Sequence, residues 1–127
     1  MSPVELTVGE LHARAGLDSD DPGVMRLTLV GTADATVEAA LNELLGRLHS
    51  DSQRARAREV AVDLRKLEFM NSSCFKSFIT WIVAVRRLAE DQTYRIRFLA
   101  NAGLHWQKRS LHAISYFGGD LVSVENA

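Results

Sequence analysis

The sequence is poor in proline and cysteine and has no long apolar run, and each shortage excludes a class of protein. Only 2 residues are proline and 8 are glycine, which excludes a disordered or fibrous chain. The single cysteine, Cys74, excludes an internal disulfide and a zinc site built from several cysteines. The longest strongly apolar stretch, residues 78–85, is far shorter than the roughly 20 residues that span a bilayer. No secretory signal opens the sequence, so we expect a cytoplasmic protein.

Neither sign of charge is in excess. The chain carries 15 basic and 16 acidic residues, and its net charge of −1 argues against a dedicated nucleic-acid binder. Hydrophobic residues make up 46% and charged residues 24%, which is typical of a soluble globular protein. A chain of 127 residues can bury a core without a disulfide or metal. We therefore expect a single domain over residues 1–127.

Hydrophobic periodicity predicts strands that alternate with helices. Alternating or short continuous apolar runs predict strands over residues 4–15 (one strand or a pair), 24–30, 60–64, 94–100 and 121–124. Apolar residues spaced three and four apart predict helices over 36–49, 72–89 and 104–117. The resulting order, β-β-α-β-α-β-α-β, predicts an α/β fold. It consists of a mixed β-sheet, mostly parallel with an antiparallel edge, and helices packed against it.

Capping and breaking residues support these elements. Gly31 is expected to close the strand before it, and Gly118-Gly119 to stop the last helix. Side-chain oxygens of Asp, Thr and Asn can accept the free amides of a first helical turn. The expected helix caps are Asp34 or Thr36, Asn71 and Asn101.

Familiar catalytic and metal-binding patterns are missing. The sequence has no P-loop, no dinucleotide-binding glycine motif, no His-Glu-x-x-His motif and no Gly-x-Ser-x-Gly elbow. The acidic loop 18–23 lacks the ligand spacing of a calcium loop. His105 and His112 are two helical turns apart, about 10 Å, which is too far to bind one metal directly. We therefore expect a binding module with no cofactor and no metal.

Three alternating arginines, Arg54, Arg56 and Arg58, have two interpretations. They form either a phosphate-binding patch or a solvated loop. The loop is favoured, because no aromatic residue lies between them.

Cys74 also has two interpretations. The positive end of the predicted helix 72–89 can lower a thiol pKa, so Cys74 is a candidate nucleophile of a small enzyme. The helical wheel instead places Cys74 with Phe78 and Trp81 on the apolar side, which favours a buried, inert thiol.

The most informative segment is residues 62–74. It combines a buried strand, a predicted crossing loop and a capped helix start. The apolar anchors expected in the loop are Leu67, Phe69 and Met70. Ser72 and Ser73 follow the cap Asn71, where free amides and the helix dipole favour a phosphate. The alternative is that these polar residues only cap the helix.

This segment resembles the STAS domain of anti-sigma-factor antagonists. That family reads Asp-Leu, a few residues, then Phe-Met-Asp-Ser-Ser-Gly. The matching residues here are Asp63-Leu64 and the run Phe69-Met70-Asn71-Ser72-Ser73. An earlier run, residues 29–34, is similar to the family's Leu-x-Gly-x-Leu-Asp, and the predicted order of elements also fits.

The resemblance implies a bacterial partner-switching protein, not an enzyme. Such a protein binds an anti-sigma factor that is also a serine kinase of the GHKL type. The kinase phosphorylates the motif serine, here Ser72 (less favoured, Ser73), which breaks the complex, and a phosphatase restores it. Asn71, Cys74 and Lys76 depart from the motif, so recognition by the kinase is expected to differ. An unphosphorylated scaffold or a small-molecule-binding STAS domain is the alternative.

The predicted helix 72–89 also offers a docking face. Its apolar arc, which we expect to face the sheet, contains Phe75, Phe78, Ile79, Ile82, Val85, Leu88 and Ala89. The residues expected to bind a partner are Asn71, Ser72, Lys76, Thr80, Val83 and Arg87. The alternative is an ordinary solvated helix face.

Overall fold

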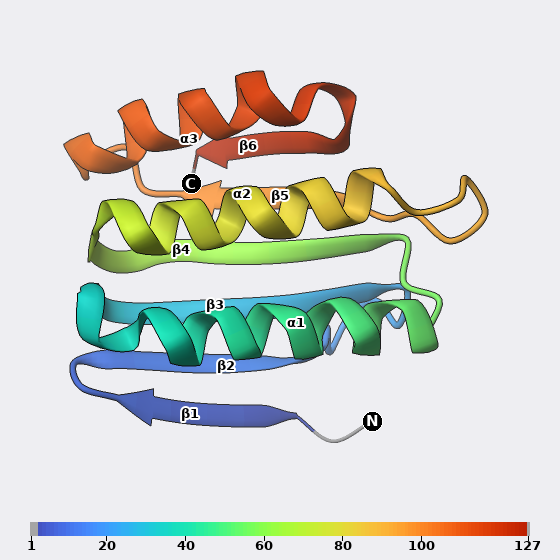
Figure 1. The fold of residues 1–127 in the computed structure, drawn as a ribbon, viewed down its shortest axis with the longest axis horizontal. Helices are drawn as coiled ribbons and strands as arrows, with labels where there is room; N and C mark the ends of the chain where they lie inside the picture. The colour runs from blue at the N-terminus through green and yellow to red at the C-terminus, as the bar shows by residue number, and fades with distance from the viewer. Residues whose placement is uncertain (1–2, 127) are drawn as a thin grey trace.

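Six strands form one mixed sheet, and three α-helices cover one of its faces (Figure 1). The computed structural model describes residues 3–126, so residues 1, 2 and 127 of the expected domain lie outside the described residues. The strands are β1 (Val4–Val8), β2 (Leu11–Leu17), β3 (Val24–Ala33), β4 (Glu59–Met70), β5 (Arg95–Ala100) and β6 (Val122–Asn126). The helices are α1 (Glu38–Arg54), α2 (Ser72–Arg86) and α3 (His105–Gly118), with short 3₁₀ turns η1 (Ala35–Val37) and η2 (Gly119–Leu121).

Strands lie in the sheet in chain order, which determines where the helices lie. β1, β2 and β3 pair antiparallel, while β3, β4, β5 and β6 pair parallel. Each parallel connection contains one helix, and right-handed crossovers that always advance in the same direction put all three on one face. The predicted α/β fold, with a parallel interior and an antiparallel edge, is confirmed.

The strands differ from the prediction mainly in length. Residues 4–15 form the pair of strands that is one of the two expectations, because Gly9 turns the chain with φ +56°, so the predicted order gains one strand at its start. β3 does not close at Gly31 but continues to Ala33. Residues 65–70 are not a crossing loop: they extend β4 to twelve residues by pairing with the end of β3. α1 likewise extends beyond the predicted 49 to Arg54.

Two of the predicted caps are confirmed and one is wrong. Asp34 accepts the amide of Thr36 at 2.9 Å and caps η1, which precedes α1. Asn71 accepts the amide of Cys74 at 3.0 Å and caps α2. Asn101 instead accepts the amide of Gly103 at 2.8 Å and closes a turn, while the N-cap position of α3 is occupied by Leu104. Gly119 ends α3 with φ +57°, as predicted.

The apolar arc of α2 packs on the sheet largely as predicted. Phe78, Ile82 and Val85 are fully buried, whereas Ala89 lies beyond the end of α2 and is exposed. Trp81 is also buried, and its Nε1–H donates to the Tyr94 hydroxyl at 2.8 Å. α2 is therefore held firmly, so the orientation of its outer face is well defined.

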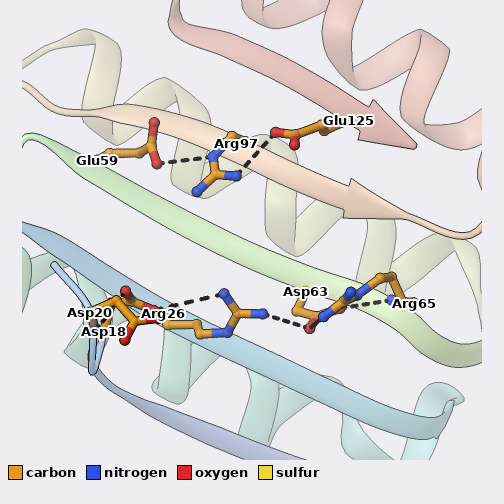
Figure 2. Close-up of polar contacts among 8 residues, drawn as sticks. All are labelled: Asp18, Asp20, Arg26, Glu59, Asp63, Arg65, Arg97 and Glu125. Carbon is orange, nitrogen blue, oxygen red and sulfur yellow. Dashed lines mark hydrogen bonds and ion pairs between the residues drawn. The ribbon is translucent and has the colours of Figure 1, made fainter. Parts of the chain in front are cut away.

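The face of the sheet away from the helices is polar, and two groups of its charged side chains are paired (Figure 2). Asp63 accepts hydrogen bonds from Arg26 at 2.9 Å and from Arg65 at 2.7 Å. On the neighbouring strands, Arg97 donates to Glu59 and to Glu125, each at 3.0 Å. Most of the charge on this open face is therefore balanced by ion pairs within the sheet.

In the arginine-rich segment at the end of α1, Arg54, Arg56 and Arg58 line one open hollow, but two of the three are paired with carboxylates. Arg54 ends the helix and pairs with Asp51, while Arg58 pairs with Asp21 in the loop that precedes the neighbouring strand β3. Arg56 adopts a left-handed turn conformation with φ 54°. The interpretation as a solvated segment is the better one, although its first part is helical.

Candidate functional site

The site lies where β3 and β4 end side by side. Because these parallel strands end at the same edge, the turn after β3 meets the start of α2. The Asn71 amide donates to the Ala33 carbonyl at 2.9 Å, and the Cys74 thiol lies 3.5 Å from the Asp34 carbonyl oxygen. The two segments that carry the sequence resemblance, 29–34 and 62–74, therefore form one continuous region.

Asn71 separates the roles of the two serines. Its side-chain oxygen accepts the Cys74 amide at 3.0 Å and the Ser73 hydroxyl at 2.9 Å. Ser73 is half-buried and its hydroxyl is engaged, whereas Ser72 is exposed. Among the residues that the structure describes, neither the hydroxyl nor the amide of Ser72 has a hydrogen-bond partner. Ser72 is the serine that is accessible to another protein.

Phe69 does not act as the predicted anchor. Leu67 and Met70 are buried as expected, but Phe69 is 47% exposed beside Asn71. The cause is a bulge: Gly31 pairs with Leu67 and Thr32 with Phe69, so Glu68 is an extra residue in the strand. The bulge leaves two successive side chains exposed and adds an aromatic surface to the site. No sequence signal reveals the bulge.

The outer face of α2 matches its predicted composition with one exception. Ser72, Lys76, Thr80 and Arg87 are exposed. Val83 is only half-exposed, so it adds less apolar surface than expected. The Thr80 hydroxyl donates to the Lys76 carbonyl at 3.0 Å and is not free to bind a partner. Lys76 and Arg87 are therefore the main groups that this face offers to a partner.

Cys74 is fully buried in the core, as the helical wheel predicts. Burial, and secondarily the carboxylate of Glu38, raises the pKa of its thiol above the ordinary value. A nucleophile needs the thiolate and access to a substrate. The arrangement at Cys74 provides neither, so the geometry gives no support to a cysteine enzyme.

We expect the Cys74 thiol to react with a disulfide reagent only when the protein opens. In a titration of the folded protein at neutral pH, labelling should be slow and should accelerate with denaturant, because the side chain is inaccessible. The unfolded protein is the internal control for full reactivity. A fast, denaturant-independent reaction would contradict this structure and revive the enzyme interpretation.

The described residues contain neither a metal-binding cluster nor a helix suited to a membrane. Within residues 3–126, no three His, Cys, Asp or Glu side chains gather closely enough to hold a metal ion. No helix in the same range combines the length and the apolar character needed to traverse a bilayer. His105 and His112 are both exposed on α3.

Comparison with known proteins rests on structure. No family model matches the sequence, and no curated protein matches it. Among solved structures, the chain is similar to an anti-sigma factor antagonist from Mycobacterium paratuberculosis. The TM-score is 0.64 at 16% sequence identity, over 93% of this chain and 90% of the other. The chain therefore has the STAS-like fold of an anti-sigma factor antagonist, as its sequence motif predicted.

Proposed function

We propose that this protein is a non-enzymatic interaction switch of a bacterial partner-switching pathway. In this proposal it acts in the cytoplasm and binds an anti-sigma factor that is also a GHKL-type serine kinase. Phosphorylation at Ser72 releases the partner, and a phosphatase resets the switch. The observation that carries the proposal is the exposed Ser72, whose hydroxyl is free at the first residue of α2.

The start of α2 suits a phosphate physically. The unpaired amides of Ser72 and Ser73 and the positive end of the helix dipole both favour an anion there. A phosphoserine brings about −1.5 to −2 charges at neutral pH. Lys76 lies roughly one turn, about 5.4 Å, further along the helix and offers a cation to the modified serine. Phosphorylation would thus change the charge of the surface without a change of fold.

The three departures from the motif have different consequences. Asn71 makes the capping bonds that an Asp would make, so the loop keeps its geometry. Cys74 points into the core and adds no bulk to the surface. Lys76 is exposed and adds a positive charge to the docking face. Of the three, Lys76 is therefore the one expected to change partner preference.

Ser72 is expected to be the principal phosphorylated residue. The protein is incubated with ATP and an extract of the cells that produce it, and the phosphate is located by intact mass and peptide mapping. Ser72→Ala should abolish the added mass, because Ser73 is engaged with Asn71. The matched control, Ser73→Ala, should keep it.

Two outcomes would contradict this assignment. A phosphate at Ser110 or Ser115, with none at Ser72 or Ser73, would place the modification on α3. A chain that binds its partner but takes no phosphate would favour the unphosphorylated scaffold.

A further inference from the structure

The two helices over the parallel half of the sheet carry charge of one sign. Neither α2 nor α3 contains an Asp or Glu. Their basic residues, with the C-cap of α2 included, are Lys76, Arg86, Arg87, Lys108 and Arg109. α1 is mixed, with Glu38, Glu43 and Asp51 beside two arginines. The whole chain has a net charge of −1, whereas α2 and α3 each carry a net positive charge.

Three of these cations also lack the carboxylate partners that Arg26 and Arg97 have on the open face. On the open face of the sheet, Arg26 and Arg97 are each held by two carboxylates. Within residues 3–126, none of Lys76, Arg87 and Arg109 forms an ion pair, and all three are exposed. No ion pair among the described residues neutralises these three cations, so they remain available to an acidic partner.

The arrangement of α2 and α3 adds to that potential. Both helices follow parallel strands, so they run in the same direction across one face (Figure 1). Their N-termini therefore lie at the same end, where the positive ends of the two dipoles reinforce each other. Ser72 stands at this end of α2.

An aromatic cluster marks the opposite end of the same surface. Tyr116 is 87% exposed and Phe117 38% exposed near the end of α3. The Arg86 guanidinium lies 4.7 Å from the centre of the Phe117 ring and also donates to the Phe117 carbonyl. These contacts join the ends of the two helices and hold Phe117 in place. An exposed aromatic ring held beside an arginine, as Phe117 is beside Arg86, has the composition of a binding hot spot.

We propose that the α2–α3 face, defined by Lys76, Arg86, Arg87, Arg109, Tyr116 and Phe117, docks an acidic protein segment that carries an apolar residue. Acidic side chains of the segment would meet the unpaired cations, and its apolar residue would contact Tyr116 and Phe117. This inference rests on the proposed function, since it names the chemistry of the partner. It also extends the docking surface from α2 to α3.

Protein is favoured over the two other anionic partners on structural grounds. A bilayer needs an apolar face to insert, but the apolar faces of α2 and α3 are buried against the sheet. Single-stranded nucleic acid needs aromatic platforms along a basic track, whereas Tyr116 and Phe117 lie together at one end. An acidic segment with one apolar residue can contact both the unpaired cations and the aromatic pair at the end of α3.

The docking face explains how phosphorylation at Ser72 would act. A phosphate would add negative charge at the head of the same face and engage Lys76, its nearest cation along the helix. The phosphate would then repel an acidic segment at the place where Lys76 had attracted it. Phosphorylated protein should accordingly bind the acidic segment more weakly than unmodified protein.

The test is a fluorescence titration of the full chain with a short labelled peptide rich in Asp and Glu that contains one Leu-Trp pair. We expect saturable binding that weakens with salt. The double variant Arg87→Glu/Arg109→Glu should weaken it by about tenfold or more, because attraction is replaced by repulsion. Tyr116→Ala should also weaken binding with an unchanged melting temperature, since the ring is 87% exposed.

The matched control for charge is Arg95→Glu. Arg95 is an exposed arginine of β5 with no ion pair among the described residues, and it lies on the open face. Its reversal should leave peptide binding within about twofold of the wild type, if location on α2 and α3 is what matters. Equal weakening by both reversals would overturn the proposal, as would tighter binding to anionic vesicles or single-stranded DNA than to the peptide.

The failure of this inference can be told from failure of the switch. A chain that takes phosphate on Ser72 but binds the acidic peptide no better than a Gln-substituted peptide overturns the docking inference alone. A chain that binds the acidic peptide on this face, yet takes no phosphate on Ser72, overturns the switch alone.

Discussion

Gly31→Ala is expected to destabilise the fold by about 3 kcal/mol, through backbone strain and a clash that cannot relax. Gly31 has φ +101°, which an L side chain rarely adopts. A Cβ atom there would overlap the carbonyl oxygen of Glu10, at the close approach of β2 and β3. That same oxygen accepts the Thr32 amide at 3.2 Å. If the Glu10 carbonyl moved away, its hydrogen bond with the Thr32 amide would break, and this bond holds the end of β3 in place.

Gly46→Ala is the matched control for this substitution. Gly46 lies on the exposed side of α1 with no atom within 4 Å of an added Cβ. The same chemical change should stabilise the protein by about 0.5–1 kcal/mol, because alanine is the better helix former. Urea denaturation of both variants gives the comparison. A midpoint for Gly31→Ala equal to the wild type would show that the β2–β3 junction yields easily and that the positive φ is not required.

Elements controlled by neighbouring residues could be predicted from the sequence. Asn71 caps α2 through an amide three residues away, so the helix start and the exposure of Ser72 follow from a short segment. The STAS-like fold follows from the order of apolar runs and from the motif at residues 62–74. Periodicity also located the buried side of α2, including Phe78 and Ile82.

Features that depend on pairing between distant segments could not be predicted. The bulge at Glu68 exists because β4 must match β3 on both sides of Gly31, and it decides that Phe69 is exposed. Asn101 has the composition of a helix cap, but its side chain closes an earlier turn. The contact between Arg86 and Phe117 joins two helices across 31 positions of sequence. Such contacts depend on how distant segments pack together, and local sequence patterns do not reveal that packing.

Asp63 is expected to make stability depend on pH in the acid range. Burial by itself raises the pKa of its carboxyl, but hydrogen bonds from Arg65 and from Arg26 outweigh burial and lower it to about 2. The unfolded chain has the ordinary value of 3.8. A carboxyl whose pKa is lower in the folded state stabilises the fold above about pH 4. That stabilisation is lost as pH falls through about 2. With Asp63 only 7% exposed, the contribution is about 2 kcal/mol.

Asp63→Asn should therefore lower the free energy of unfolding by about 2 kcal/mol at pH 7, and the gap to the wild type should close between pH 4 and pH 2. A loss larger than this is not expected, because the Arg26 and Arg65 side chains, 32% and 44% exposed, can turn to water once the carboxylate is gone. Urea denaturation across this pH range measures the gap. Glu125→Gln is the control, since Glu125 is 60% exposed and its pair with Arg97 contributes about 0.5 kcal/mol or less. A gap that stays constant down to pH 2 would mean that Asp63 acts through packing rather than charge.

Asp63 lies on the open face of the sheet (Figure 2), whereas Ser72 begins a helix on the other face. The substitution should therefore leave phosphorylation of Ser72 intact while the protein is folded.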